Sequence, residues 1–246
     1  YVYIAFNLIR LLPAPHDAIS RVLQEFSVAL NLSDNGLKGP SLSPLCKVLN
    51  RQTTLHELNL SGNFLTNECF QLLAASVASL ENLSRLNLNC TNLHADHLQT
   101  LASTLSPDVA YNVTDLDLSD NLIGDSCLEN LAVLTRRFQL KKLNLSGNKF
   151  TKDIFNYSSN NQVLLNLDQV EEFDVSDNWL NGGNLVKLLS WLKPSILRYV
   201  NVSRNSVTDG FLAEVFKNWS DAKKLKICKL SRCCVRDSDM FDLLRL

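Results

Sequence analysis

Apolar and polar residues follow a fixed rhythm in residues 55–80, LHELNLSGNFLTNECFQLLAASVASL. Leu58 and Leu60 alternate with polar residues, which is the period of a short strand with one buried face. From Phe70 onward the apolar residues recur at helical spacing, and Thr66 is a typical helix N-cap residue. The segment therefore predicts a strand, a tight turn and a helix.

The same frame recurs along nearly the whole chain, with apolar residues at fixed offsets around one polar position. That position holds Asn35, Asn63, Thr91, Asn121, Asn148, Asn178, Asn205 and Cys233. Successive members are 27 to 30 residues apart, which is the signature of leucine-rich repeats. In the first copy, SVALNLSDNGL, only Ser27 departs from the frame.

The predicted fold class is therefore α/β: a leucine-rich-repeat solenoid, or horseshoe, with parallel strands on its concave face and helices on its convex face. We expect about eight repeats of 27–30 residues, beginning near residues 27, 55, 83, 113, 140, 170, 197 and 225. They belong to one domain, residues 16–246, which has a cap helix near 16–26. Residues 1–15 are interpreted as an upstream segment and linker. The polar cluster at 156–161 predicts a loop or a broken helix.

The polar position of each repeat has a structural explanation. It lies where the chain leaves the strand and turns, and an Asn amide can donate to and accept from backbone groups that would otherwise be buried unpaired. We therefore interpret these residues as a structural ladder and not as a catalytic set. Thr91 and Cys233 are weaker partners, so their turns are expected to be less rigid.

Charge and cysteine content narrow the classes of function. The formal net charge of −1 gives no general attraction to nucleic acid or anionic membranes, and no run of 18 apolar residues predicts a membrane span. The seven cysteines are scattered without a paired framework, as free thiols are in a reducing compartment. We therefore expect an intracellular protein.

The concave face is the candidate interaction surface, because strand residues that do not enter the core point to it. Its middle is acidic and its C-terminal end is basic with an aromatic residue: Asp115, Asp117, Asp120, Glu172, Asp174 and Asp177, followed by Tyr199, Arg204, Lys229 and Arg232. This order suits a protein partner with the opposite order of charge. The alternative is an ordinary solvated polar face.

Enzyme chemistry finds little support in the sequence. There is no Gly-rich phosphate loop, nucleophile elbow or paired-cysteine zinc spacing. The stretch HADH, residues 94–97, has a conceivable metal spacing, but we expect solvent-exposed polar residues there. The prediction is a protein that is not an enzyme and has no metal, cofactor or catalytic residues. Basic pairs such as Lys223-Lys224 lack interleaved aromatic residues, so direct nucleic-acid binding is not expected.

The frame as a whole resembles the ribonuclease-inhibitor-like leucine-rich repeats. Within it, the features LSPL, TLHELNLSGNFLTNEC, an alanine-rich helix and LSRLNL are similar to the C-terminal repeats of Tonsoku-like proteins. The later segment VEEFDVSDNWLNGGNLVKLLSWLKPSILRYVNVS is similar to a further repeat pair of that family. The polar cluster at 156–161 and Ser27 depart from the pattern and leave the register there open.

The resemblance implies a nuclear scaffold for homologous-recombination repair and maintenance of stalled or broken replication forks. In that family the C-terminal repeats are implicated in engaging a large fork-repair partner, while upstream domains bind histones. Two other classes remain open. One is the sensor repeats of a cytosolic nucleotide-binding receptor, which would make the chain cytoplasmic, and the other is a protein inhibitor of a soluble enzyme.

Overall fold

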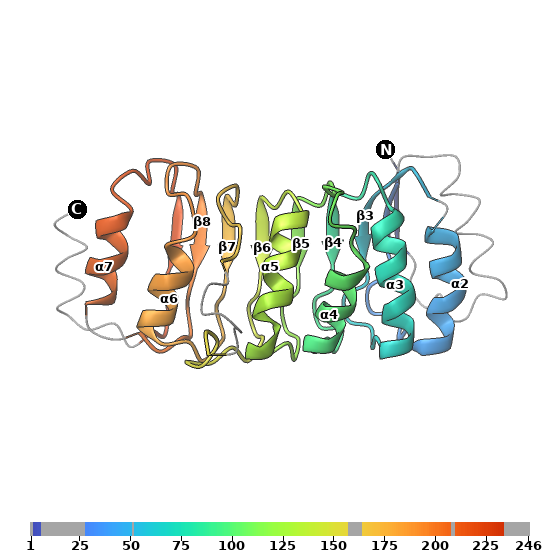
Figure 1. The fold of residues 1–246 in the computed structure, drawn as a ribbon, viewed down its shortest axis with the longest axis horizontal. Coiled ribbons are helices and arrows are strands. Elements are labelled where there is room, and N and C mark those ends of the chain that lie inside the picture. The colour runs from blue at the N-terminus through green and yellow to red at the C-terminus, as the bar shows by residue number, and fades with distance from the viewer. Residues whose placement is uncertain (1, 6–27, 51, 157–163, 208–209, 234–246) are drawn as a thin grey trace.

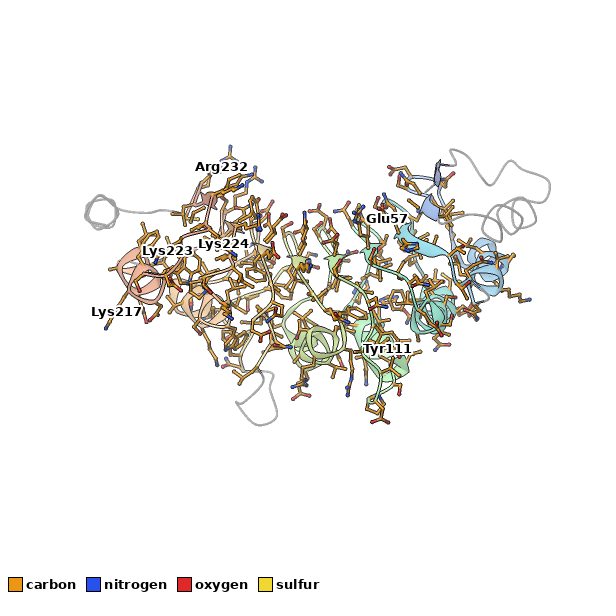
Figure 2. All side chains as sticks on the ribbon, turned by 90° about the horizontal axis from the view of Figure 1, so that it is seen from above. Glu57, Tyr111, Lys217, Lys223, Lys224 and Arg232 are labelled. Atoms are coloured by element: carbon orange, nitrogen blue, oxygen red, sulfur yellow. The ribbon has the colours of Figure 1, made fainter. Side chains whose placement is uncertain are left out.

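A computed structural model describes residues 2–5, 28–50, 52–156, 164–207 and 210–233. Within this part of the chain, nine strands form one parallel sheet whose order follows the sequence (Figure 1). Seen from above, the molecule is an open arc with the strands on its inner side and the helices on its outer side (Figure 2). The predicted fold class is therefore confirmed.

The strands are short and each contributes one rung to the sheet. They are β1 (Val2–Ala5), β2 (Val28–Asn31), β3 (Leu55–Asn59), β4 (Arg85–Asn87), β5 (Asp115–Asp117), β6 (Lys142–Asn144), β7 (Glu172–Asp174), β8 (Tyr199–Asn201) and β9 (Ile227–Lys229). The convex side carries α2 (Gly39–Leu49), α3 (Asn67–Ser79), α4 (Ala95–Thr104), η2 (Asp125–Cys127), α5 (Leu128–Arg137), α6 (Gly182–Leu189) and α7 (Phe211–Asn218). The predicted cap helix near 16–26 and most of the 156–161 cluster lie outside the described residues.

The strand register follows the repeat frame. Leu58 of β3 aligns with Leu86 of β4, and equivalent positions stay aligned through β9. Their side chains are buried from β3 through β8, so corresponding residues of neighbouring repeats stack into one hydrophobic core. No single repeat could bury this surface alone, which is why the solenoid is held together by contacts between neighbours.

The sheet begins earlier than the sequence analysis predicts. Val2–Ala5, which we placed in an upstream segment, pair in parallel with Val28–Asn31 as β1, and Ile4 is opposite Leu30. This correction adds one strand to the eight expected from the frame. The boundary at residue 15 therefore does not separate the first residues from the sheet.

The ladder asparagines bond to their own turn and to the preceding repeat. Asn121 Nδ2 donates to the carbonyls of Leu118, Ser119 and Leu88 at 2.8–3.0 Å. Its Oδ1 accepts from the backbone N–H groups of Thr91 and Leu93 at 3.0 and 2.9 Å. Each such side chain satisfies backbone groups of two repeats that are buried from water.

Ladder positions differ in how many bonds they make. Thr91 Oγ1 donates to the carbonyl of Leu88 in its own turn, and Cys233 Sγ makes longer contacts, to the carbonyls of Val202 at 3.2 Å and Ser231 at 3.7 Å. Asn148 keeps three donor bonds, but its Oδ1 is buried and has no hydrogen-bond donor among the described residues. The ladder is therefore continuous but uneven.

Several helices begin with the same capping arrangement. The third helical residue turns back to accept from the N–H of the cap: Cys69 Sγ from Thr66, His97 Nδ1 from His94, and Asn184 Oδ1 from Asn181. Thr66 is the N-cap of α3, as predicted. His97 corrects the expectation of exposed polar residues at HADH, because only 3% of it is exposed. Its ring packs edge-on against Phe70 with the centroids 4.9 Å apart.

His97 is expected to make the stability of the domain depend on pH. Burial, and secondarily His94, lowers the pKa of His97 below its ordinary value of 6.5. Since the unfolded chain then binds more protons, stability is full above about pH 6.5 and falls as the pH drops, by at most about 1.4 kcal/mol per pH unit. Urea unfolding between pH 8 and pH 5 measures this slope.

Replacing His97 by Asn tests the assignment, because the Asn of α6 at the equivalent position keeps the cap bond without titrating. The His97→Asn variant should show a shallower pH slope than the wild type, whatever its absolute stability. Equal slopes in His97→Asn and wild type would contradict the role of His97.

The cysteines described in the structure are all free thiols: Cys46, Cys69, Cys90, Cys127, Cys228 and Cys233. Burial raises the pKa of Cys46 to about 11 and also raises the pKa of Cys127. These thiols stay protonated near neutral pH and are therefore weak nucleophiles and weak metal ligands.

Candidate interaction surface

The concave face is built from three rows of side chains that run across the strands. The first row consists of Glu57 of β3 and the first residue of each strand from β4 to β9. The second row consists of the last residue of each strand. The third, which we call the turn row, consists of the residues three positions after those of the second row. Residues in one row on neighbouring strands are about 4.8 Å apart across the sheet, so each row is a line of contacting side chains.

Charges alternate along the first row and pair with each other. Arg85 lies between Glu57 and Asp115 and forms an ion pair with both, the second at 3.1 Å. Lys142 pairs with Glu172 at 3.0 Å. Exposed pairs of this kind contribute about 0–1 kcal/mol to stability. Their main effect is to neutralise two of the acids, Asp115 and Glu172, that we predicted to face a basic partner.

Two acids of the second row form no ion pair among the described residues, and they keep their charge on the surface. Asp117 accepts from the backbone N–H and the hydroxyl of Ser119, and from Asn144 Nδ2 at 3.3 Å. Asp174 is held in the same way by Ser176 and also accepts from Asn201 Nδ2 at 2.8 Å. Neutral donors therefore orient both carboxylates.

Tyr199 joins the acidic middle of the face to its basic end. Its hydroxyl donates to Asp174 Oδ2 at 3.2 Å, and Lys229 Nζ lies 5.3 Å from the centre of its ring. A cation over an aromatic face at this distance is attracted to the ring. The half-buried Tyr199 ring is thus fixed from both sides, which suits a residue that anchors a partner.

The residues of the turn row share an unusual backbone conformation, which the charge pattern of the sequence does not indicate. Every residue of this row adopts a positive φ, between 52° and 67°: Asp34, Gly62, Cys90, Asp120, Gly147, Asp177, Arg204 and Arg232. Only Gly adopts this conformation without steric cost. Arg204 pairs with Asp177 at 3.1 Å, while Asp120 accepts from Asn89.

A groove of about 440 Å³ runs along the middle of the concave face. Five of the predicted contact residues line it: Asp115, Asp117, Glu172, Asp174 and Tyr199. The other five, Asp120, Asp177, Arg204, Lys229 and Arg232, do not line the groove. The structure therefore gathers half of the predicted set in one groove.

Four residues outside the ten predicted contact residues are further candidates for contact with a partner. Glu57 and Arg85 line the groove from its N-terminal side and belong to the alternating first row. Trp179, which follows the ladder residue Asn178, is 64% exposed, and Ile227, the neighbour of Tyr199 across β8 and β9, is 48% exposed. Large exposed apolar side chains are candidates for buried anchors at an interface.

Comparison with family models agrees with the repeat geometry. A model described as Leucine Rich Repeat matches residues 139–162, and one described as Leucine Rich repeat matches residues 51–68 and 112–132. Both lie on the strand, turn and ladder positions described above. The chain is a leucine-rich-repeat protein.

Curated relatives of this leucine-rich-repeat protein include Tonsoku-like proteins and NACHT, LRR and PYD domains-containing proteins. Tonsoku-like protein of Mus musculus is 28% identical over 212 residues, 83% of this chain and 16% of the relative. Tonsoku-like protein of Bos taurus is 35% identical over 101 residues, 41% of this chain and 7% of the relative. NACHT, LRR and PYD domains-containing protein 9B of Mus musculus is 30% identical over 149 residues, 57% of this chain and 15% of the relative.

These matches confirm that the repeats resemble those of Tonsoku-like proteins. The chain spans between 7% and 16% of the length of these three relatives. No helix in the described part of the leucine-rich-repeat protein is long and apolar enough to span a membrane. Repeats of this fold typically serve as scaffolds for protein interactions.

Proposed function

We propose that this leucine-rich-repeat chain is the protein-binding part of a Tonsoku-like scaffold that acts in the nucleus. Its role is in homologous-recombination repair and in the maintenance of stalled or broken replication forks, where its repeats engage the family's large fork-repair partner. The observation that carries the proposal is the similarity to Tonsoku-like protein over 83% of the chain. Histone binding in this proposal belongs to upstream domains.

The concave groove supports a protein partner as the ligand. Asp117 and Asp174 present charge that no cation among the described residues neutralises, and Tyr199 lies beside them as a fixed aromatic side chain. Arg204 and Arg232 lie beyond the end of the groove and are exposed. Charged rims mainly set the rate of association, whereas a central aromatic or arginine residue contributes most of the affinity.

A second candidate is a sensor repeat of a cytosolic nucleotide-binding receptor. It is favoured by the match to a NACHT, LRR and PYD domains-containing protein, which covers 57% of this chain. The two candidates differ in compartment and partner. Both can therefore be tested with one capture experiment performed on two extracts.

Site-specific photocrosslinking tests the proposal. A photoreactive amino acid replaces Asn144, which lines the concave groove, or Gln71, which is exposed on convex helix α3 as the matched control. We expect a cross-linked partner from nuclear extract at position 144 and none at 71, and mass spectrometry should identify a fork-repair protein. A partner captured only from cytosolic extract would overturn the nuclear role.

Two double variants then locate the binding energy. Asp117→Lys with Asp174→Lys is expected to slow association and to change its salt dependence. Tyr199→Ala with Arg232→Ala is expected to weaken binding by about 2 kcal/mol or more and to speed dissociation. Surface plasmon resonance with the captured partner measures both rates. If both folded variants bind like the wild type, the concave face is not the binding site.

A further inference from the structure

Basic residues are concentrated at the C-terminal end of the arc, outside the concave groove. Between residues 211 and 232 the chain carries six basic residues, Lys217, Lys223, Lys224, Lys226, Lys229 and Arg232, and only two acidic residues, Glu214 and Asp221. Figure 2 shows Lys217, Lys223 and Lys224 at the same end of the arc as Arg232, which lies toward its inner side. We call these six residues the basic end.

The loop between α7 and β9 holds these lysines in a fixed arrangement. Trp219 is buried, and Ala222 and Leu225 pack partly buried against the core, so every third residue of the loop points inward. Backbone bonds close the turns between them, from Ala222 N–H to the carbonyl of Trp219 at 2.9 Å and from Leu225 N–H to the carbonyl of Ala222 at 3.2 Å. The lysines at 223, 224 and 226 therefore project outward from an anchored loop.

The charge of the basic end is almost unneutralised by the described residues. Its one ion pair among the described residues joins Lys223 to Asp221 at 3.9 Å, with both side chains largely exposed. Lys229 lies over the Tyr199 ring, which leaves its charge in place. All six basic residues are exposed to solvent. By contrast, Arg204 and Arg198 in the preceding repeat are paired with Asp177 and Glu171.

The chemistry of the basic end fits a phosphate backbone better than an acidic protein. Five of its six cations are lysines, which act as point charges and suit phosphates independently of sequence. A protein interface needs an apolar core, but the exposed Ile227 belongs to the first row of the concave face, and the aromatic residues beside the loop lysines, Phe216 and Trp219, pack against each other with the rings 6.4 Å apart and Trp219 buried. For the same reason they cannot stack on the bases of a single strand.

We propose that the basic end binds the phosphate backbone of double-stranded DNA without reading its sequence. This goes beyond the proposed function, because the partner of the concave groove is a protein. It also revises the expectation drawn from the net charge of −1, which averages an acidic body with a basic end. Each lysine contact releases a counterion from the duplex, so binding weakens steeply with salt.

Fluorescence anisotropy of the full chain with a labelled DNA duplex tests the proposal. Lys223→Glu with Lys224→Glu is compared with a control of equal charge change at the other end of the solenoid, Lys38→Glu with Lys47→Glu. Between about 50 and 200 mM salt, the wild type should lose affinity by about 10³-fold if six contacts form. The first pair should weaken binding about 10-fold or more and lower the salt slope by about 2, because two contacts are lost.

The control pair should leave the salt slope unchanged and the affinity within about twofold of the wild type. A single strand of equal length should bind more weakly than the duplex, since its charge density is lower and the basic end offers no stacking surface. Equal losses of affinity in the two double variants would mean that only the net charge of the chain matters, and would overturn the basic end as a binding site. Binding of poly-glutamate but not of duplex would also overturn it, in favour of an acidic protein partner.

Discussion

Replacing Leu118 by alanine is expected to lower the free energy of unfolding by about 2–5 kcal/mol. Leu118 follows β5 directly, in the middle of the stack, and has no exposed surface. The equivalent residues of the neighbouring repeats, Leu88 and Leu145, are also buried. The loss combines the transfer energy of the removed atoms with the cavity left between two repeats that cannot collapse onto it. Urea unfolding followed by circular dichroism measures it.

The adjacent residue Asp117, the last residue of β5, provides a control. Asp117→Asn keeps an acceptor for the Ser119 N–H group and lies on the concave side, so it should change stability by about 0.5 kcal/mol or less. A period-2 strand places these two neighbours on opposite faces. Comparable losses in the two variants would contradict the assigned strand register.

The repeat frame made most of this fold predictable. A leucine such as Leu58 is uninformative alone, but its recurrence every 27 to 30 residues specifies which side chains face the core and which strands are neighbours. Parallel order follows as well, because each repeat returns to the same edge through a helix or loop. Repetition therefore supplied information about tertiary contacts that a non-repetitive sequence of this length does not carry.

β1 was not predicted, because its copy of the repeat frame has no polar residue at the ladder position. Ile4 pairs with Leu30, and the ladder residue Asn35 lies five residues after Leu30. The equivalent position five residues after Ile4 is Ile9. An isoleucine there hides the frame, although Tyr1, Ile4 and Phe6 have its apolar spacing. Aligning the apolar positions alone would have found β1.

The pairing of charges on the concave face could also have been found from the sequence. Glu57, Arg85 and Asp115 occupy one frame position in consecutive repeats, which places them on adjacent strands at contact distance. Describing the middle of the face only as acidic concealed the alternation of acidic and basic residues at this one frame position. By contrast, the exposure of Trp179 depends on the direction of a side chain in a turn, which the frame does not specify.

The buried histidine shows a limit of a different kind. Histidine is a polar residue, so we expected His97 at the surface. Its ring, however, accepts a hydrogen bond from the N–H group of His94 at the start of α4 and packs against Phe70, and this capping geometry buries it. Cys69 and Asn184 make the same capping bond, because each side chain carries an acceptor atom at a similar distance from its backbone. A repeat alignment of the third helical residue would have indicated a common role.

Replacing a ladder asparagine is expected to have the second large effect on stability. Asn121→Ala is expected to lower the free energy of unfolding by about 3 kcal/mol or more, because it leaves several buried backbone groups without partners at about 1–3 kcal/mol each. The orphaned groups include the N–H groups of Thr91 and Leu93, which donate to Asn121 Oδ1. The carbonyls of Leu88, Leu118 and Ser119 lose the Nδ2 donor as well.

Asn148→Ala is the matched control, since Asn148 donates three equivalent bonds, to Leu118, Leu145 and Ser146. Its Oδ1, however, accepts no bond from the described residues, so removing it orphans no N–H group. Asn121→Ala should therefore be more destabilising than Asn148→Ala by about 1–3 kcal/mol, in urea melts with matching m-values. Equal losses would mean that the acceptor half of the ladder contributes nothing, and that the donor bonds alone connect one repeat to the next.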